Sequence, residues 1–275
     1  MKRYFLQKIR HVTHDQAALL VNKKRLFVVC LLLAANFLCV STRCAAAAYD
    51  LSTPAGLLEW VTHYYEHKDA ASVVTAIREM FKQGAFDEQD AQAAFAAGFL
   101  SMVFAQNQDK IGGWFDELDD LALAQQRYLW IALDFSKCAA GREILTKIRE
   151  KVEPAPAQFI GELLAQPYVD VLETAIDNTG ALEVCWGLFF AGGDERYIVK
   201  IISTLSGLSQ PYNEVLGVQD PRVIAESARR NLIYDAARHP RILEICKSEM
   251  ERQPQEVREA LAEIIEKAEL ERKAE

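Results

Sequence analysis

The stretch from Ala91 to Asn107, AQAAFAAGFLSMVFAQN, decides the fold class of this chain. Its large apolar side chains recur at intervals of three or four residues, which places them on one face of an α-helix and not on alternating faces of a strand. These side chains are Phe95, Phe99, Met102 and Val103. Because an acidic residue suits the N-terminal end of a helix, we expect this helix to begin at Asp87.

The same helical period continues on both sides of this segment. Pro54 follows Ser52 and Thr53, so a capping side chain precedes a proline at the first helical position. No segment alternates between apolar and polar residues for long enough to predict a strand. Further helices are expected at 54–67, 73–81, 111–118, 121–135, 142–152, 159–164, 169–176, 182–190, 196–205, 223–237, 242–250 and 257–270. The sequence therefore predicts an all-α protein, an irregular array of about a dozen amphipathic helices in antiparallel pairs.

The N-terminal 48 residues have the layout of a secretory signal peptide. Three basic residues, 23–25, precede the mostly apolar run 26–40, and four alanines, 45–48, follow it. We expect cleavage near Ala48, which leaves a single helical domain, 49–275, in the periplasm or the medium. The alternative is that residues 26–42 stay in place and anchor the domain to the inner membrane, although the run is short for a membrane span.

The charge of the chain changes when this segment is removed. The chain has 31 Lys and Arg against 39 Asp and Glu, and the first 48 residues hold eight of the basic residues and one of the acidic ones. The remainder has 23 against 38, a net charge of −15. Such a surface repels phosphate, so we expect no nucleic-acid partner, and membrane contact only through the N-terminal segment.

The cysteines do not form a disulfide framework. Cys138, Cys185 and Cys246 remain after cleavage, so at most one disulfide can form within the chain. Cys185 and Cys246 lie in apolar periodic segments, which favours small buried side chains. Whether any pair is oxidised is left open by the sequence.

Four corners between the expected helices look alike. In each, an apolar helix ends, the chain turns, and the next helix begins with a charged residue and an isoleucine. The isoleucines are Ile111, Ile144, Ile198 and Ile242, at spacings of 33, 54 and 44 residues. The pattern resembles degenerate HEAT-like or TPR-like helical-repeat proteins, although the signature motif of neither family is present. The resemblance implies a concave surface that binds a protein or peptide, and the alternative is an irregular helical bundle.

One motif has the residue types of a metal site. His63-Tyr64-Tyr65-Glu66-His67 matches H-x-x-E-H and resembles the zinc-binding helix of the inverted zinc peptidases. The resemblance implies that His63 and His67 hold zinc, that Glu66 activates a water molecule, and that a distant acid such as Glu143 completes the ligands. The alternative is an ordinary helix end, with Val61 and Tyr64 facing the core and the three motif residues in solvent.

A second motif resembles a nucleotide-cyclase signature. Gly192-Gly193-Asp194-Glu195-Arg196 shares four of its five residues with the GGDEF sequence of diguanylate cyclases. That sequence lies on a β-hairpin, whereas both flanks here are typical of helices. We therefore expect the glycines to end one helix and the two acids to cap the next.

The pair Gly112-Gly113, followed by Trp114, is a weak candidate for a binding site. Two glycines early in a helix cost roughly 2 kcal/mol relative to alanine, so we expect them to allow the close approach of a neighbouring helix or, as the alternative, of a ligand. No nucleotide-binding loop or serine-nucleophile motif is present, and no cofactor is expected.

These observations favour an exported helical-repeat protein that binds a protein or peptide, or serves in assembly, without catalysis of its own. The rival hypothesis is a zinc-dependent hydrolase that uses the His63-Glu66-His67 motif. The partner, the biological process and the oligomeric state are not indicated by the sequence.

Overall fold

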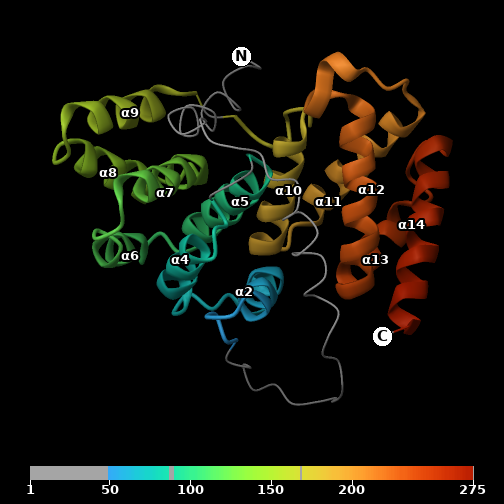
Figure 1. The fold of residues 1–275 in the computed structure, drawn as a ribbon, viewed down its shortest axis with the longest axis horizontal. Coiled ribbons are helices and arrows are strands. Elements are labelled where there is room, and N and C mark those ends of the chain that lie inside the picture. Colours follow the sequence, from blue (N-terminus) through green and yellow to red (C-terminus); the bar gives the residue numbers. More distant parts are fainter. Residues whose placement is uncertain (1–48, 87–89, 168, 275) are drawn as a thin grey trace, which may run out of the picture.

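The computed structural model describes residues 49–86, 90–167 and 169–274. Every regular element in these ranges is a helix, so the all-α class is confirmed (Figure 1). The expected signal peptide, its cleavage point at Ala48 and the expected helix start at Asp87 lie outside them. Within the ranges described, no helix is both long enough and apolar enough to cross a membrane.

The first half of the described chain begins with the helix start predicted from its capping residues. The Thr53 hydroxyl accepts a hydrogen bond from the Gly56 N–H at 3.1 Å, and Pro54 occupies the first helical position. The helices of this half are α2 (Pro54–Thr62), α3 (Tyr64–His67), α4 (Val73–Lys82), α5 (Asp90–Gln106), α6 (Ile111–Glu117), α7 (Leu123–Ser136), α8 (Ala139–Arg149) and α9 (Pro154–Ala165).

In the second half, two long helices begin at side-chain caps. The Asn178 side chain accepts a hydrogen bond from the Ala181 N–H at 2.8 Å, and the Asp220 carboxylate accepts one from the Arg222 N–H at 2.8 Å. The elements of this half are α10 (Thr179–Gly192), α11 (Glu195–Ser203), the 3₁₀ helices η1 (Thr204–Ser209) and η2 (Glu214–Gln219), α12 (Pro221–Arg238), α13 (Pro240–Glu249) and α14 (Gln255–Ala274).

One helix that the sequence predicts does not form. Residues 169–176 form turns and irregular structure, so the helix predicted there is wrong. The Asp170 carboxylate accepts a hydrogen bond from the Leu172 N–H at 2.8 Å, and the Asp170 carbonyl accepts one from the Thr174 hydroxyl at 2.8 Å. These local bonds compete with the helical pattern, as aspartate commonly does in turns.

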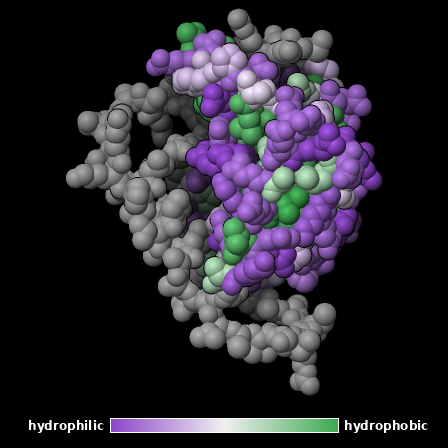
Figure 2. Space-filling view, turned by 90° about the vertical axis from the view of Figure 1, so that its right-hand side faces the viewer, coloured by the Kyte–Doolittle hydropathy of each residue, from purple (hydrophilic) through white to green (hydrophobic). Residues whose placement is uncertain are grey.

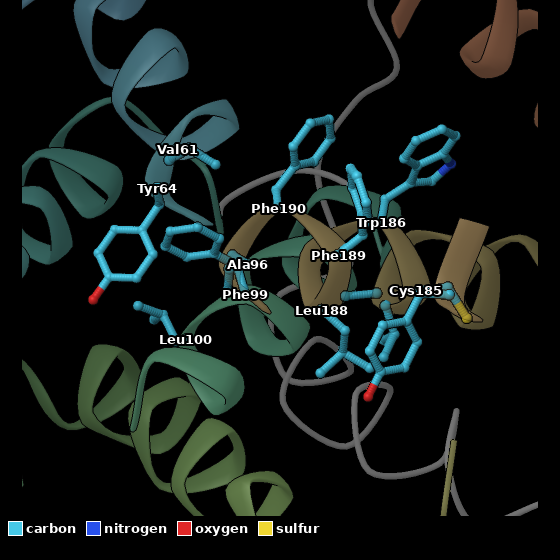
Figure 3. Close-up of a cluster of buried hydrophobic side chains, with 14 of the residues drawn as sticks. Val61, Tyr64, Ala96, Phe99, Leu100, Cys185, Trp186, Leu188, Phe189 and Phe190 are labelled. Carbon is cyan, nitrogen blue, oxygen red and sulfur yellow. The ribbon is translucent and has the colours of Figure 1, made fainter. Parts of the chain in front are cut away.

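The centre of the fold is the crossing of α5 and α10, the most extensive contact between elements of the described chain. Phe99 of α5 and Phe189 and Phe190 of α10 contribute to the aromatic cluster around it (Figure 3). Two glycines allow the close approach. A Cβ on Gly187 would lie 2.2 Å from the Phe95 carbonyl oxygen, and a Cβ on Gly98 would lie 2.6 Å from the Val184 carbonyl oxygen.

Other helices flank this crossing on both sides. Helices α6 to α9 lie on one side of it and α12 to α14 on the other (Figure 1). Neighbours in sequence pack together within each group, as in α7–α8, α8–α9, α12–α13 and α13–α14. The α5–α10 crossing, however, joins helices separated by four others. Such a long-range contact is a feature of a bundle, because repeats in a solenoid contact only their neighbours.

The last helix closes one end of the array. Its apolar stripe is buried, and it consists of Val257, Leu261, Ile264 and Ala268. Its outer face carries charged side chains, such as Glu269, which pairs with Lys247 of α13. Figure 2 shows this side of the molecule, which is mainly hydrophilic with scattered apolar patches.

Candidate functional site

A cavity of about 480 Å³ lies among α5, α7, α10, α11, the end of α9 and the irregular residues 166–167 and 169–177. Its wall is mainly apolar, and Met102 of α5 and Val184 and Leu188 of α10 contribute to it. The volume is within the range of about 300–1,000 Å³ that is typical of small-molecule binding sites. The cavity is therefore large enough to hold a small ligand or part of a larger one.

One side of the cavity carries a largely buried ion pair at the C-terminal end of α7. Lys137 Nζ lies 3.1 Å from Asp134 Oδ2, and the side chains are 24% and 5% exposed. Lys137 caps α7 in the left-handed conformation, with φ of 51°. The pair leaves this part of the wall polar without excess charge.

The cavity wall contains a second cation. Lys200 of α11 is half-buried, and its Nζ donates a hydrogen bond to the Leu172 carbonyl oxygen at 3.0 Å. In the part of the chain that the structure describes, no carboxylate forms an ion pair with it. Lys200 therefore differs from Lys137, which is paired with Asp134.

The potential nucleophiles in the cavity are neutral at physiological pH. Burial raises the pKa of the Cys185 thiol to about 12, with the Lys200 ammonium opposing the shift. Burial also raises the pKa of Tyr197 to about 12, and the nearby Asp194 and Asp170 carboxylates add to it. Because the thiolate is the reactive form of cysteine, these groups suit a binding site better than a covalent catalytic one.

Sequence reasoning missed this site. The four helices that form it were predicted, but their meeting depends on contacts between segments as far apart as Ser101 and Lys200. The one local signal is Lys200 itself, which is the only charged residue in the apolar run 197–202, YIVKII. A lone lysine in an apolar helical run is a signal for a site, because lysine is rarely buried without a partner.

A second cluster of polar side chains, Glu183, Asp235 and His239, lies partly buried where α10 meets α12 and the start of α13. Burial raises the pKa of Glu183 to about 7, against a hydrogen bond from the Asn231 amide, at 3.2 Å, that lowers it. Burial and the Glu183 charge raise the pKa of Asp235 to about 8. Burial, His63 and Arg238 lower the pKa of His239 to about 4. All three shifts favour neutral side chains in this part of the core.

The H-x-x-E-H motif does not lie on one continuous helix. Helix α2 ends at Thr62, and His63 occupies the break before the single turn of α3, with φ of −110° and ψ of 6°. His63 Nδ1 lies 3.0 Å from the Glu59 carbonyl oxygen, and its ring centroid lies 4.9 Å from that of His239, with the two rings tilted by 55°. The expected helix over 54–67 is thus interrupted at the residue that begins the motif.

The other motif residues point to an ordinary helix end. Glu66 and His67 are exposed, whereas Val61 and Tyr64 are buried in the core. Glu143, the suggested distant ligand, pairs with Lys147 at 2.7 Å, which lowers its pKa. In the ranges described, no group of three or more His, Cys, Asp or Glu side chains is placed to hold a metal ion.

The glycine pair of α6 has no close neighbour. A Cβ on Gly112 or Gly113 would meet nothing within 4 Å, and both residues are exposed. The expectation that they allow the close approach of a neighbouring helix is wrong, because no described atom lies within 4 Å on this face of α6. The alternative, the approach of a ligand, stays a prediction. Trp114 is 6% exposed, and its ring lies 6.2 Å from that of Phe104, so it serves as a core anchor.

The GGDEF-like sequence forms a helix end and a helix start, as expected. Gly193 ends α10 with φ of 74°, and Asp194 caps α11 by accepting a hydrogen bond from the Arg196 N–H at 3.0 Å. The Arg196 guanidinium also bonds the Asp194 carboxylate, with Nη2 at 2.6 Å from Oδ2. A local capping role accounts for these residues.

The three cysteines expected after cleavage are free thiols. Cys138, Cys185 and Cys246 are all buried. Burial raises the pKa of Cys246 to about 12, as it does for Cys185. No disulfide joins cysteines in the part of the chain described, and the sequence prediction of small buried side chains is confirmed for Cys185 and Cys246.

Comparisons with known proteins add no relative to this description. No protein-family model, no curated protein and no solved structure matches the chain.

Proposed function

We propose that residues 49–275 form an exported, non-catalytic module that binds a protein or peptide by taking an apolar part of it into the cavity. The observation that carries the proposal is the cavity of about 480 Å³ with a mainly apolar wall. Export rests on the N-terminal sequence, with its basic residues, apolar run and four alanines.

The chemistry of the cavity supports binding without catalysis. Cys185 and Tyr197 keep their protons at neutral pH because their pKa values are about 12. The Asp134 carboxylate is held by Lys137, so it is poorly placed to act as a general base. An apolar wall with few polar groups is the usual composition of a site that recognises by burial.

The test fills the cavity at a position outside the tightly packed core. Ala105 of α5 lines the cavity and is only half-buried, so an Ala105→Phe side chain should occupy the space where a ligand would lie. Calorimetric titration with decanol, a neutral apolar probe, should show binding to the wild-type protein. We expect Ala105→Phe to weaken that binding by roughly tenfold or more.

The matched control places the same side chain elsewhere. Ala124 of α7 is exposed and does not line the cavity, so Ala124→Phe should bind decanol as the wild type does. Both variants should keep the helical circular-dichroism spectrum. If Ala105→Phe folds normally and binds decanol with unchanged affinity, the cavity is not the binding site.

A further inference from the structure

Lys200 is a half-buried cation in the wall of a mainly apolar cavity. Its neighbours Ile198, Ile201 and Ile202 are fully buried, so α11 packs into the core and directs Lys200 to the cavity. The other cation of the cavity, Lys137, is paired with Asp134 at 3.1 Å. Among the described residues, the Lys200 ammonium bonds the Leu172 carbonyl and no carboxylate, so it keeps donors for an anion, and a partner carboxylate would offset its desolvation.

Two acidic residues of the cavity wall form hydrogen bonds with groups other than Lys200. Asp170 accepts a hydrogen bond from the Leu172 N–H at 2.8 Å, and Asp177 accepts one from the Asn178 amide at 2.7 Å. Asp194, at the start of α11, bonds the Arg196 guanidinium, with Nη2 at 2.6 Å. None of these three carboxylates forms an ion pair with Lys200, so its ammonium can pair with the carboxylate of a ligand.

The segment beside Lys200 offers backbone groups. Ala175, Ile176 and Asp177 line the cavity and belong to no helix or strand. Their N–H groups have no hydrogen-bond partner among the described residues. A peptide backbone laid along an irregular segment can pair with several such groups through its carbonyl oxygens, whereas a fatty acid has acceptors only at its carboxylate.

From these three observations we infer that the cavity binds the C-terminal end of an apolar peptide. The terminal carboxylate pairs with Lys200 Nζ, the last apolar side chains fill the cavity, and the peptide backbone lies along residues 175–177. The inference rests on the proposed function and adds the class of ligand and the residue that orients it. Tyr197, which also lines the cavity and carries its proton, is a further donor that the peptide can use.

The experiment compares two forms of one probe. A hexapeptide that ends in Leu-Val-Phe is titrated into the purified protein, once with a free C-terminal carboxylate and once as the C-terminal amide. We expect the free acid to bind about tenfold more tightly or better, the usual worth of a hydrogen bond to a charged group. In a Lys200→Met variant that difference should disappear, whereas Lys147→Met, which removes an exposed lysine of α8, should preserve it.

Each outcome is decisive, and the acid–amide comparison on the wild-type protein needs no variant to fold. If the acid and the amide bind equally, the proposed pairing of the terminal carboxylate with Lys200 is overturned. The proposed function, binding in the apolar cavity, would remain. Failure of both peptides while decanoate binds would identify a fatty-acid site and overturn the peptide ligand. Failure of the peptides, decanoate and decanol together would overturn the proposed function as well.

Discussion

Two carboxyl groups, Glu183 and Asp235, have pKa values well above those of free carboxyl side chains. Their pKa values are raised to about 7 and about 8, in both cases mainly by burial. Between the unfolded pKa of about 4 and these values, the folded protein binds protons that the unfolded chain has released. Both groups therefore make the protein less stable as the pH rises through that window.

An Asp235→Asn substitution should expose this effect. Asparagine carries no charge, so near pH 4 the variant and the wild type should have the same free energy of unfolding. As the pH rises toward 8, the variant should become more stable than the wild type. Above pH 8 the variant should be more stable by roughly 2–4 kcal/mol. This is less than the full pKa shift of Asp235 would give, because Asp235 is only half-buried. Urea denaturation at a series of pH values measures it.

The control for this substitution is Asp116→Asn, on the exposed face of α6. It should change stability little at any pH, as surface substitutions usually do. If the difference in free energy of unfolding between Asp235→Asn and the wild type does not change with pH, the pKa of Asp235 is the same in the folded and the unfolded protein.

Side chains at single positions were predictable from the sequence where the cause is local. The caps at Thr53 and Asp194 follow from residue type and from the glycine or proline beside them. The acidity of Glu183 and Asp235 was not predictable, because it depends on which helix covers each carboxyl. Nor could the sequence show that the His63 ring contacts that of His239, a residue 176 positions away.

At the scale of elements, the α5–α10 crossing depends on two single glycines. Gly98 and Gly187 were not singled out from the sequence, whereas the adjacent pair Gly112-Gly113 was. Two adjacent glycines weaken a helix locally, and this is visible in the sequence. The close approach of two helices depends instead on which residues of the second helix pack against the glycine. The same limit explains the helix wrongly predicted at 169–176, where local bonds of Asp170 override an apolar period.

Two alanine substitutions should separate these glycines. Gly187→Ala places a Cβ 2.2 Å from a backbone oxygen of α5, so we expect a loss of several kcal/mol as the two helices move apart. Gly112→Ala meets nothing within 4 Å and should raise stability by about 0.5–1 kcal/mol, because alanine favours the helix. Thermal denaturation of both variants gives the comparison, and equal melting temperatures would contradict the close crossing.

At the scale of the whole molecule, the fold class was predictable and the site was not. Helical periodicity is a local property, so it could be read along the chain without knowing which helices meet. The cavity is assembled from α5, α7, α10, α11 and an irregular segment, and no local pattern records their meeting. The expected pairing of neighbours in sequence holds in the flanking groups, but the central crossing joins helices that are distant in the chain.

Thiol counting tests the expected processing of the whole chain. The full sequence has six cysteines, and three of them, Cys138, Cys185 and Cys246, are buried free thiols. Reaction with a thiol reagent should be very slow in the native protein and should give three thiols per chain in denaturant. Six thiols would mean that the N-terminal segment is retained, and fewer than three would reveal a disulfide or a modified cysteine.

The contact of α5 and α10 through glycine has a consequence for ligand entry. A Cβ on Gly98 or Gly187 would clash with the facing backbone, so the spacing of α5 and α10 behind the cavity is set before anything binds. The side chains that line this wall, such as Met102 and Leu188, can still change rotamer. An occupant would therefore enter against a fixed backbone, and the entropy lost on association would fall mainly on the occupant and on these side chains.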